Sequence, residues 1–533
     1  MTEGFGRSNP DGSADVVAEP TVLSAASDFK AVPHRAILTT CMMMAVIMTS
    51  LDTTVANVAL PHMQGELSGT QDEMGWVLTS YIVATAIMIP LGGWLANEFG
   101  RRKVFLISIV VFTVASALCG LAQSLPQIVL FRFVQGAGGA ALVPLAQAVL
   151  FDINPPKDFG RAMTIFVAGS NLAPIMGPIL GGWLTEDYNW RWVFYINLPI
   201  GILAFFGLFF TLPDGRKAKS SQFDFFGFGM LSLAIASFQL MLDRGQLLDW
   251  FSSSEIIIEA AVAGLSLYLF LVHSFSSPKP FVNLALFKDR NFVAATVFIF
   301  LVGVVLFATL ALLPPMLQEQ LNYPVILTGL VTAPRGFGMV TALIFVGSLT
   351  KRLGSRAVMA LGLIVTAYAS WQMTQFSPLM GYWPVIISGI SQGAGIGLVY
   401  VPLTTVAFTT LPGTLRNDGT AFFNLLRNLG SSIGISVVMF LLTQNTQRLH
   451  SSLVSDVTPY NSRANPALAA AHVDVTTLKG LAGLDAMITN QAVMIAYIDD
   501  FWLIMVMTLA TIPFLLLIKD AKPAAGAHVA AFE

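Results

Sequence analysis

The chain has 533 residues, of which 55% are hydrophobic and 11% charged, and its mean hydropathy is +0.72. This composition is too apolar for a soluble globular protein and indicates an integral membrane protein. The formal net charge of -2 argues against nucleic acid as a partner, because binding phosphates requires a concentrated basic patch. The two cysteines and six scattered histidines provide neither a disulfide framework nor a metal-ligand cluster.

Residues 1–32 are polar and rich in Ser, Ala and Asp, which predicts a disordered cytoplasmic tail rather than a signal peptide. After this tail, apolar runs of about 20 residues alternate with short polar breaks, the pattern of transmembrane helices. About fourteen such helices are expected, at 36–60, 74–96, 104–122, 127–150, 161–184, 191–212, 223–242, 253–275, 292–314, 325–349, 355–376, 382–409, 418–443 and 497–519.

The orientation of these helices follows from the basic residues of alternate loops. With a cytoplasmic N-terminus, the inside loops contain Arg101, Arg102, Lys103, Lys157, Arg161, Arg216, Lys217, Lys219, Lys279, Lys288, Arg290, Lys351, Arg352, Arg356 and Arg416. The opposite loops contain few basic residues, so both termini, including the tail at 520–533, are expected in the cytoplasm.

The sequence contains an internal repeat. GGWLANEFGRRK at 92–103 returns as VGSLTKRLGSR at 346–356, 254 residues later, and the QGAG that begins at Gln135 returns 257 residues later at Gln392. Two six-helix halves do not fill this offset, so the segments at 223–242 and 253–275 are interpreted as an insertion. The prediction is an all-α membrane protein of 6+2+6 helices, with two pseudo-symmetric bundles around a central cavity. Its parts are an N-terminal bundle at 33–215, inserted helices at 216–280 and a C-terminal bundle at 281–519 that includes an external loop at 444–496.

Two ionisable residues lie inside predicted spans of the first half. Arg132 is the one charge in LFRFVQGAGGAALVP, and an intramembrane arginine costs several kcal/mol unless it is paired or faces a polar cavity. Helix geometry places Asp52 roughly 14 Å and Arg132 roughly 9 Å below the same face. We therefore expect the two within electrostatic reach, as a proton-coupling pair in which the carboxylate loads and releases a proton. The alternative is a purely structural ion pair. The second copy has Gly389 at the position of Arg132, so coupling is assigned to the N-terminal half.

Several motifs resemble those of the major facilitator superfamily, in particular its fourteen-helix drug:proton antiporters. They are LDTTVANVALP at 51–61, GWLANEFGRRK at 93–103, RFVQGAGGA in helix 4, GSNLAPIMGPILGGWL at 169–184 and WRWVFYINLPIG at 190–201. MLDRGQLLDWFSSSEI at 241–256 and the long loop before the last helix are similar to the inner-membrane pumps of Gram-negative tripartite multidrug systems. The resemblance covers nearly the whole chain and implies the major facilitator fold.

The resemblance also implies a gate that joins helices 2 and 11, built on the motif between helices 2 and 3. The aspartate of the family motif falls on Asn97, so its role cannot be transferred unchanged, and Glu98 is the candidate substitute. The residues assigned to the gating motif are Gly93, Asn97, Glu98, Gly100, Arg101 and Lys103.

The fifth helix carries an antiporter motif whose residues are Pro174, Gly177, Pro178, Gly181 and Gly182. The prolines remove backbone donors and the glycines remove side chains, so the helix can bend and pack closely against a partner. The resemblance implies a partner in the other half and a seal against uncoupled leak. The alternative is ordinary kinked packing.

The substrate cavity is expected to be mostly apolar with a few polar groups, on inward helices. The candidates are Trp76, Tyr81, Met88, Gln135, Gln147, Asn171, Gln392, Tyr400, Phe423, Asn424 and Arg427. Asn424 and Arg427 are three residues apart and therefore share one helix face. Each single methionine or aromatic residue has helix packing as its alternative role.

These features predict a proton-coupled efflux pump of the inner membrane that exports diverse hydrophobic and amphipathic drugs by alternating access. No GxxxxGK[ST] motif is present, so the proton gradient is the expected energy source and no cofactor is expected. The resemblance implies a periplasmic adaptor and an outer-membrane channel as partners, and the loop at 444–496 is either their docking surface or a tolerated loop. One alternative is a dedicated exporter of one metabolite such as a siderophore, fatty acid or antibiotic. A solute importer is disfavoured by the antiporter motif, and an intramembrane enzyme by the lack of clustered catalytic groups.

Overall fold

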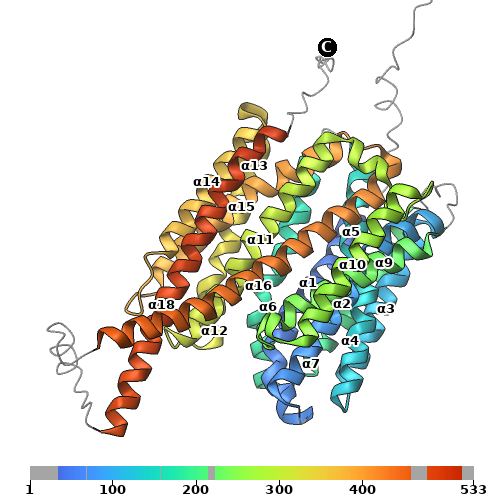
Figure 1. Cartoon of the computed structure of the whole chain (residues 1–533). Coiled ribbons are helices and arrows are strands. Elements are labelled where there is room, and N and C mark those ends of the chain that lie inside the picture. The colour runs from blue at the N-terminus through green and yellow to red at the C-terminus, as the bar shows by residue number, and fades with distance from the viewer. Residues whose placement is uncertain (1–33, 68, 156–157, 214–222, 458–476, 519–533) are drawn as a thin grey trace, which may run out of the picture. The chain divides into compact units, whose positions relative to one another are not determined.

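The computed structural model describes residues 34–67, 69–155, 158–213, 223–457 and 477–518, and the regular structure in these ranges is entirely helical. The predicted all-α class is therefore confirmed (Figure 1). The two tails expected at 1–32 and 520–533 lie outside the described residues.

The helices of the first half are α1 (Arg35–Leu67), α2 (Gln71–Phe99), α3 (Arg101–Leu121), α4 (Leu125–Gly139), α5 (Leu142–Ile153), α6 (Phe159–Asp187), α7 (Trp192–Tyr195) and α8 (Asn197–Thr211). The insertion contains α9 (Phe225–Arg244), η3 (Trp250–Ser252), α10 (Ser254–Ser276) and η4 (Leu284–Lys288). The second half contains α11 (Arg290–Glu319), α12 (Val325–Thr332), α13 (Pro334–Leu353), α14 (Ser355–Met373), α15 (Trp383–Thr409), η5 (Gly413–Leu415), α16 (Arg416–Asp456), α18 (Leu478–Thr511) and η6 (Ile512–Leu517).

Each of the fourteen predicted segments coincides with a helix or with a helix broken once. Within the described residues, twelve helices are long and apolar enough to cross a membrane, and α6 and α14 occupy the two remaining positions. The predicted span at 325–349 is broken between α12 and α13, where Pro334 has no backbone N–H to donate.

Both described ends of the segment expected as a loop at 444–496 are helical. The helix α16 continues to Asp456, and α18 begins at Leu478 with the Thr477 side chain accepting a hydrogen bond from Gly480 N. Polarity suggested a loop, but neither extension contains a proline to interrupt a helix. His450 and Asp485 lie 3.0 Å apart and join the two extensions.

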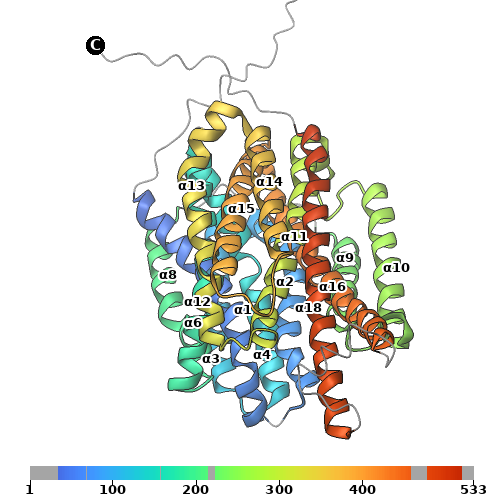
Figure 2. The same cartoon turned by 90° about the vertical axis from the view of Figure 1, so that its left-hand side faces the viewer.

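The two halves repeat the same packing scheme. In the first half α1 packs on α6, and α4 packs on both α2 and α3; in the second half α11 packs on α16, and α15 packs on both α13 and α14 (Figures 1 and 2). Gly100 and Gly354 separate the equivalent helix pairs with φ of 89° and 84°, values that favour glycine. The repeat in the sequence is thus a repeat in the structure.

The inserted helices form a hairpin that touches both halves. The helix α9 packs on α10, on α2 of the first half and on α16 of the second (Figure 1). The Thr79 hydroxyl donates to the Asp243 carboxylate, and Ser436 Oγ donates to Leu242 O at 2.9 Å. Apolar residues of the hairpin and of both halves share one buried cluster.

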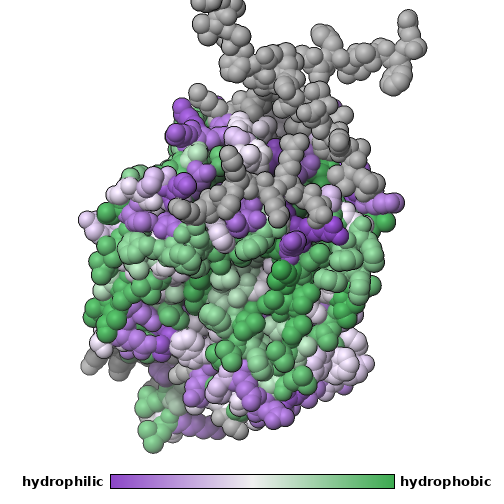
Figure 3. All heavy atoms as spheres, turned by 90° about the vertical axis from the view of Figure 1, so that its right-hand side faces the viewer, coloured by the Kyte–Doolittle hydropathy of each residue, from purple (hydrophilic) through white to green (hydrophobic). Residues whose placement is uncertain are grey.

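The face of the molecule in Figure 3 carries a broad apolar band between more polar ends. Phe210, Phe225 and Phe275 are 78%, 79% and 75% exposed, and they belong to a long series of exposed large apolar side chains of the kind that marks contact with lipid or another protein. The surface therefore fits a chain that crosses the bilayer many times.

Candidate functional site

Asp52 lies at the centre of a buried polar cluster in the first half. Arg132 Nη1 contacts Asp52 Oδ2 at 2.5 Å, and Gln135 Nε2 donates to Asp52 Oδ1 at 2.8 Å. Asn197 of α8 donates to the same oxygen at 2.9 Å and to Ser116 Oγ of α3 at 3.0 Å. The side chains of Asp52 and Arg132 are fully buried, so the pair has no contact with solvent.

The guanidinium of Arg132 is held on several sides. Its Nε donates to Val77 O at 3.1 Å, its Nη1 also donates to Gln135 Oε1 at 2.9 Å, and the Tyr81 ring lies 4.3 Å from its Cζ. Arg132 Nη2 is buried without a hydrogen-bond partner in the described residues. Hence α1, α2, α4 and α8 meet at one ion pair, and α3 joins the cluster through the bond between Ser116 and Asn197.

In this arrangement the stability of the N-terminal bundle depends on the charge of Asp52. A buried pair loses about 3–5 kcal/mol when one partner is removed, because the other charge remains uncompensated. Protonation of Asp52 leaves Arg132 as an unpaired cation among apolar helices, so the bundle must rearrange or admit a polar group. A proton can therefore shift a conformational equilibrium at this position. The coupling role of the pair stays a prediction.

The gating motif joins the two halves at the end of α2. Asn97 Nδ2 donates to Asp418 Oδ1 at 2.8 Å, and Asn417 Nδ2 donates to Asn97 Oδ1 at 2.6 Å. Gly93 lies against the backbone of Asn417 and Asp418, so that a Cβ there would meet their atoms at 3.2–3.3 Å. The partner helix is α16, the thirteenth predicted span rather than the eleventh, because the two inserted helices shift the count.

A carboxylate bridges two arginines beside this contact. Asp152 of α5 forms ion pairs with Arg101 of α3 and with Arg416 of α16, the second at 2.7 Å. Gly100 supplies the left-handed turn between α2 and α3, while Lys103 is exposed. Asn97 makes the contact to the other half here, and Glu98, the candidate substitute, lies one position further along α2.

The glycines of the antiporter motif pack mainly within their own half. Gly177 lies against the Thr54 side chain of α1, and Gly181 lies against Val55 and Val58 of α1. Gly182 is the motif glycine that faces α12, where a Cβ would be 3.9 Å from Ile326. The helix α6 packs on α12, α13 and α15 of the other half, while its Gly177 and Gly181 pack against α1. The role of the motif as a seal stays a prediction. The side chains of Pro174 and Pro178 lie outside the described residues.

The predicted cavity residues divide among several places. Tyr81 and Gln135 belong to the Asp52 cluster, and Met88 packs against the buried cluster shared with the hairpin. Trp76 faces the hairpin, with Arg244 Cζ 5.2 Å from its ring. Phe423 is fully buried beside Phe408. The side chain of Asn171 lies outside the described residues.

Other predicted cavity residues pair across or within the halves. Asn424 Nδ2 donates to Gln147 Oε1 at 2.8 Å and so links α16 to α5. Arg427 Nη1 donates to the Tyr400 hydroxyl at 3.0 Å. The structure therefore brings these four together in two pairs.

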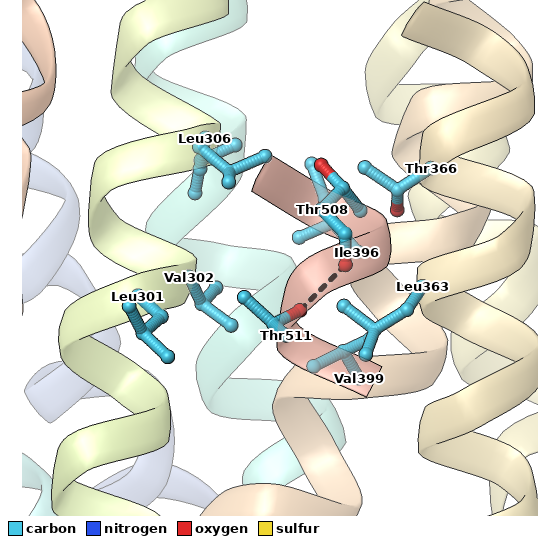
Figure 4. A pocket seen from close by; sticks show the side chains of 10 residues that line it. Leu301, Val302, Leu306, Leu363, Thr366, Ile396, Val399, Thr508 and Thr511 are labelled. Atoms are coloured by element: carbon cyan, nitrogen blue, oxygen red, sulfur yellow. Dashed lines mark hydrogen bonds between the residues drawn. The ribbon is translucent and has the colours of Figure 1, made fainter. Parts of the chain in front are cut away.

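Three cavities differ in size and polarity. The smallest, about 20 Å³, lies between α11, α14, α15 and α18 and has almost wholly apolar walls with two threonines of α18 beside them (Figure 4). A cavity of about 280 Å³ lies beside the gating motif and is lined by Asn97, Asp224, Lys279 and Asp418 among others. A third, of about 120 Å³, contains Arg335 and Gln392.

Sequence reasoning did not single out several of these residues. Asn197 stood within a quoted motif, and Arg335 stood within the predicted span at 325–349 as an intramembrane arginine. Asp500, 1% exposed in α18, is a further buried carboxylate. The signal that could have found all three is the same, namely a strongly polar residue inside an apolar segment.

Comparisons with known proteins agree with this architecture. The family model described as Major Facilitator Superfamily matches residues 42–435. The chain belongs to the Major Facilitator Superfamily. Members of this family are transporters, so the chain is a membrane transporter rather than an enzyme.

Individual relatives cover most of the chain. It is 35% identical over 475 residues to the multidrug export protein EmrB of Escherichia coli K12, and the matched region covers 88% of this chain and 92% of that protein. It is 33% identical to the fatty acid resistance protein FarB of Neisseria gonorrhoeae, over 91% of this chain and 96% of that protein. The solved structure of the proton:xylose symporter XylE has a TM-score of 0.57 at 15% identity, covers 90% of this chain and 95% of its own, and supports the fold alone.

Proposed function

We propose that the chain is a proton-driven exporter of diverse hydrophobic and amphipathic compounds that works by alternating access. The observation that carries this proposal is the buried Asp52–Arg132 pair, in which one proton changes the charge of the bundle. The similarity to EmrB supports multidrug compounds as substrates.

The free energy that drives drug export comes from the proton that enters along its gradient. In the deprotonated state the pair is neutral and can remain buried. When Asp52 is protonated, Arg132 loses its counter-ion and requires a new partner. Rocking of the two halves about the Asn97–Asp418 contact changes which groups surround Arg132. The basic residues of alternate loops support cytoplasmic termini, and the similarity to EmrB supports the inner membrane as the location.

The test is transport into or out of proteoliposomes with an imposed pH gradient. A panel of neutral and cationic hydrophobic drugs is offered at fixed drug concentration, with and without a protonophore. Transport that follows the gradient and stops with the protonophore is expected. Transport that ignores the gradient removes proton coupling from the proposal.

The similarity to EmrB also supports assembly with a periplasmic adaptor and an outer-membrane channel. The extended ends of α16 and α18, joined at His450 and Asp485, are the surface where we expect the adaptor. The measurement is capture of the adaptor by the full-length chain. We expect capture to be lost when the charged residues of both extensions are reversed in sign.

A second candidate is a dedicated exporter of one metabolite class. The similarity to FarB, whose name refers to fatty acid resistance, favours this candidate. The same transport panel separates the two, because a dedicated exporter moves one chemical class and leaves the other drugs behind.

A further inference from the structure

The repeat aligns the Asp52 cluster with a specific set of residues in the second half. The motif that ends α2 and the one that ends α13 are 254 residues apart, and that offset aligns Tyr81 with Arg335. The two QGAG segments are 257 residues apart, and that offset aligns Gln135 with Gln392 and Arg132 with Gly389.

Hydrogen bonds support the alignment independently. Gln135 Nε2 donates to Asp52 Oδ1 at 2.8 Å, and Gln392 Nε2 donates to Thr309 Oγ1 at 3.0 Å. Thr309 lies 257 residues after Asp52, on α11, which is the counterpart of α1. The second half therefore contains the same site with different side chains.

The differences leave one cation without its counter-ion. In the first half the arginine stands on α4 and is neutralised by Asp52 while Tyr81 covers its face. In the second half a threonine replaces the aspartate, and the arginine stands on α13 as Arg335. Among the described residues Arg335 forms no ion pair, and its Nη2 is buried without a hydrogen-bond partner.

A cavity adjoins this unpaired guanidinium. The space of about 120 Å³ is lined by Thr309, Arg335, Gly389 and Gln392 at its polar end and by residues such as Leu313 and Met339 elsewhere. Gly389 faces Arg335, with a distance of 3.7 Å from the position of a Cβ to Arg335 Cβ. Gly389, which occupies the position equivalent to Arg132, thus leaves space beside Arg335.

We propose that this cavity binds the carboxylate of an amphipathic substrate. A planar guanidinium with free N–H groups matches a carboxylate, and the apolar wall accommodates the carbon chain next to it. The cavity is smaller than the roughly 300–1,000 Å³ of drug-sized pockets, so it receives the head of the molecule and not the whole. This inference rests on the proposed export function and specifies one class of its substrates.

The test uses decanoate, with methyl decanoate as its uncharged match, and the full chain in nanodiscs of phosphatidylcholine without a proton gradient. Binding is measured by calorimetry and by the rise in unfolding temperature. We expect decanoate to bind and the ester to bind much more weakly. Arg335→Gln should weaken decanoate binding about tenfold or more, since it removes a hydrogen bond to a charged group. Arg352→Gln, at an exposed position of the same helix, should leave it unchanged.

A matched pair of substitutions tests the mechanism without removing Arg335. Thr309→Asp places a carboxylate at the position equivalent to Asp52 and should exclude decanoate, whereas Thr309→Asn, which has the shape of aspartate but no charge, should weaken decanoate binding much less. This comparison remains valid if Arg335→Gln does not fold. Equal binding by parent and Arg335→Gln, equal loss in both Thr309 variants, or equal binding of acid and ester overturns the inference.

The outcome is separable from that of the proposed function. Decanoate binding without gradient-driven transport leaves the site standing and rejects proton-driven export. Gradient-driven drug export with no preference for the acid rejects the carboxylate site and leaves the export function standing.

Discussion

At the scale of single residues, the Asp52 cluster shows how one carboxylate can connect three helices, α1, α4 and α8. Arg132 and Gln135 of α4 contact Asp52 Oδ2 and Oδ1 respectively, and Asn197 of α8 also donates to Oδ1. The three contacts satisfy most of the hydrogen-bonding capacity of the ionised form.

Asp52→Asn should abolish transport driven by a pH gradient while drug binding continues. Asparagine has the same shape, so the bundle can fold, but it has no charge to lose when the proton concentration changes. The measurement is drug uptake in proteoliposomes beside drug binding in detergent. Asp243→Asn, which alters a carboxylate of the hairpin outside the cluster, is the control and should transport normally. Full gradient-driven transport by Asp52→Asn would contradict a coupling role.

Much of the first-half cluster could be predicted from the sequence, because Asp52 and Arg132 are charges inside apolar segments at matching depths. The amides were harder to predict. Gln135 was expected in the substrate cavity, since sequence spacing gives the helix face of a residue but not the identity of the facing helix. Asn197 follows a short helix break whose direction is determined by packing alone.

At the scale of helices, the contact between α2 and α16 depends on one amide. Asn97 both donates to Asp418 and accepts from Asn417, which an ionised aspartate at this position could not do, because it has no donor. The family motif has aspartate here, and in this chain the carboxylate stands on the opposite helix. The carboxylate that accepts the hydrogen bond therefore lies on α16, and the amide that donates it lies on α2.

Asn97→Asp should therefore open this end of the molecule, because two carboxylates would face each other. The measurement is the distance between spin labels at Phe99→Cys and Thr414→Cys, both exposed positions near the contact, and a longer distance is expected. Adding Asp418→Asn restores an acid–amide pair and should restore the short distance. An unchanged distance in the single variant would show that the contact does not hold the halves together.

Close packing of α13 on α15 gives a second prediction for helices. A Cβ at Gly338 would overlap the backbone of Ile390, whereas nothing lies within 4 Å of a Cβ at Gly347 on the same helix. Gly338→Ala should lower the free energy of unfolding by about 1–3 kcal/mol through overpacking. Gly347→Ala should be neutral or stabilising, because alanine favours a helix over glycine by about 1 kcal/mol. Thermal unfolding followed by intrinsic fluorescence distinguishes the two, and equal midpoints would contradict the packing argument.

The helix positions were predictable because long apolar runs are a strong signal, and every predicted span has a helix at its place. The ends of helices were not. The helices α16 and α18 extend through polar residues that read as a loop, since a helix already nucleated in the membrane continues until a residue stops it.

At the scale of the whole molecule, the hairpin formed by α9 and α10 limits how the halves move. It contacts α2 through Asp243 and Thr79 and contacts α16 through Leu242 and Ser436. Arg244 of the hairpin also lies over the ring of Trp76 in α2. The hairpin therefore has more kinds of contact with α2 than with α16. When one half rocks against the other, we expect the hairpin to stay with α2 and to separate from α16.

Two cross-links should therefore differ in effect. Cysteine pairs at Thr79 and Asp243, or at Leu242 and Ser436, are bridged by a short bifunctional thiol reagent, with the buried native Cys41 and Cys119 replaced by serine. The bridge from hairpin to α2 should leave transport intact, and the bridge from hairpin to α16 should stop it. Transport that survives both bridges would show that the hairpin does not constrain the cycle.

The unequal charges of the two halves have an electrical consequence. The ion pair of Asp52 and Arg132 carries no net charge, whereas Arg335 carries a positive charge that a bound carboxylate cancels. Exchange of one entering proton for one departing neutral drug moves a single charge across the membrane, but exchange for a departing carboxylate moves two. Each charge is worth about 2.3 kcal/mol per 100 mV. The membrane voltage should therefore drive the export of acids twice as strongly as the export of neutral drugs.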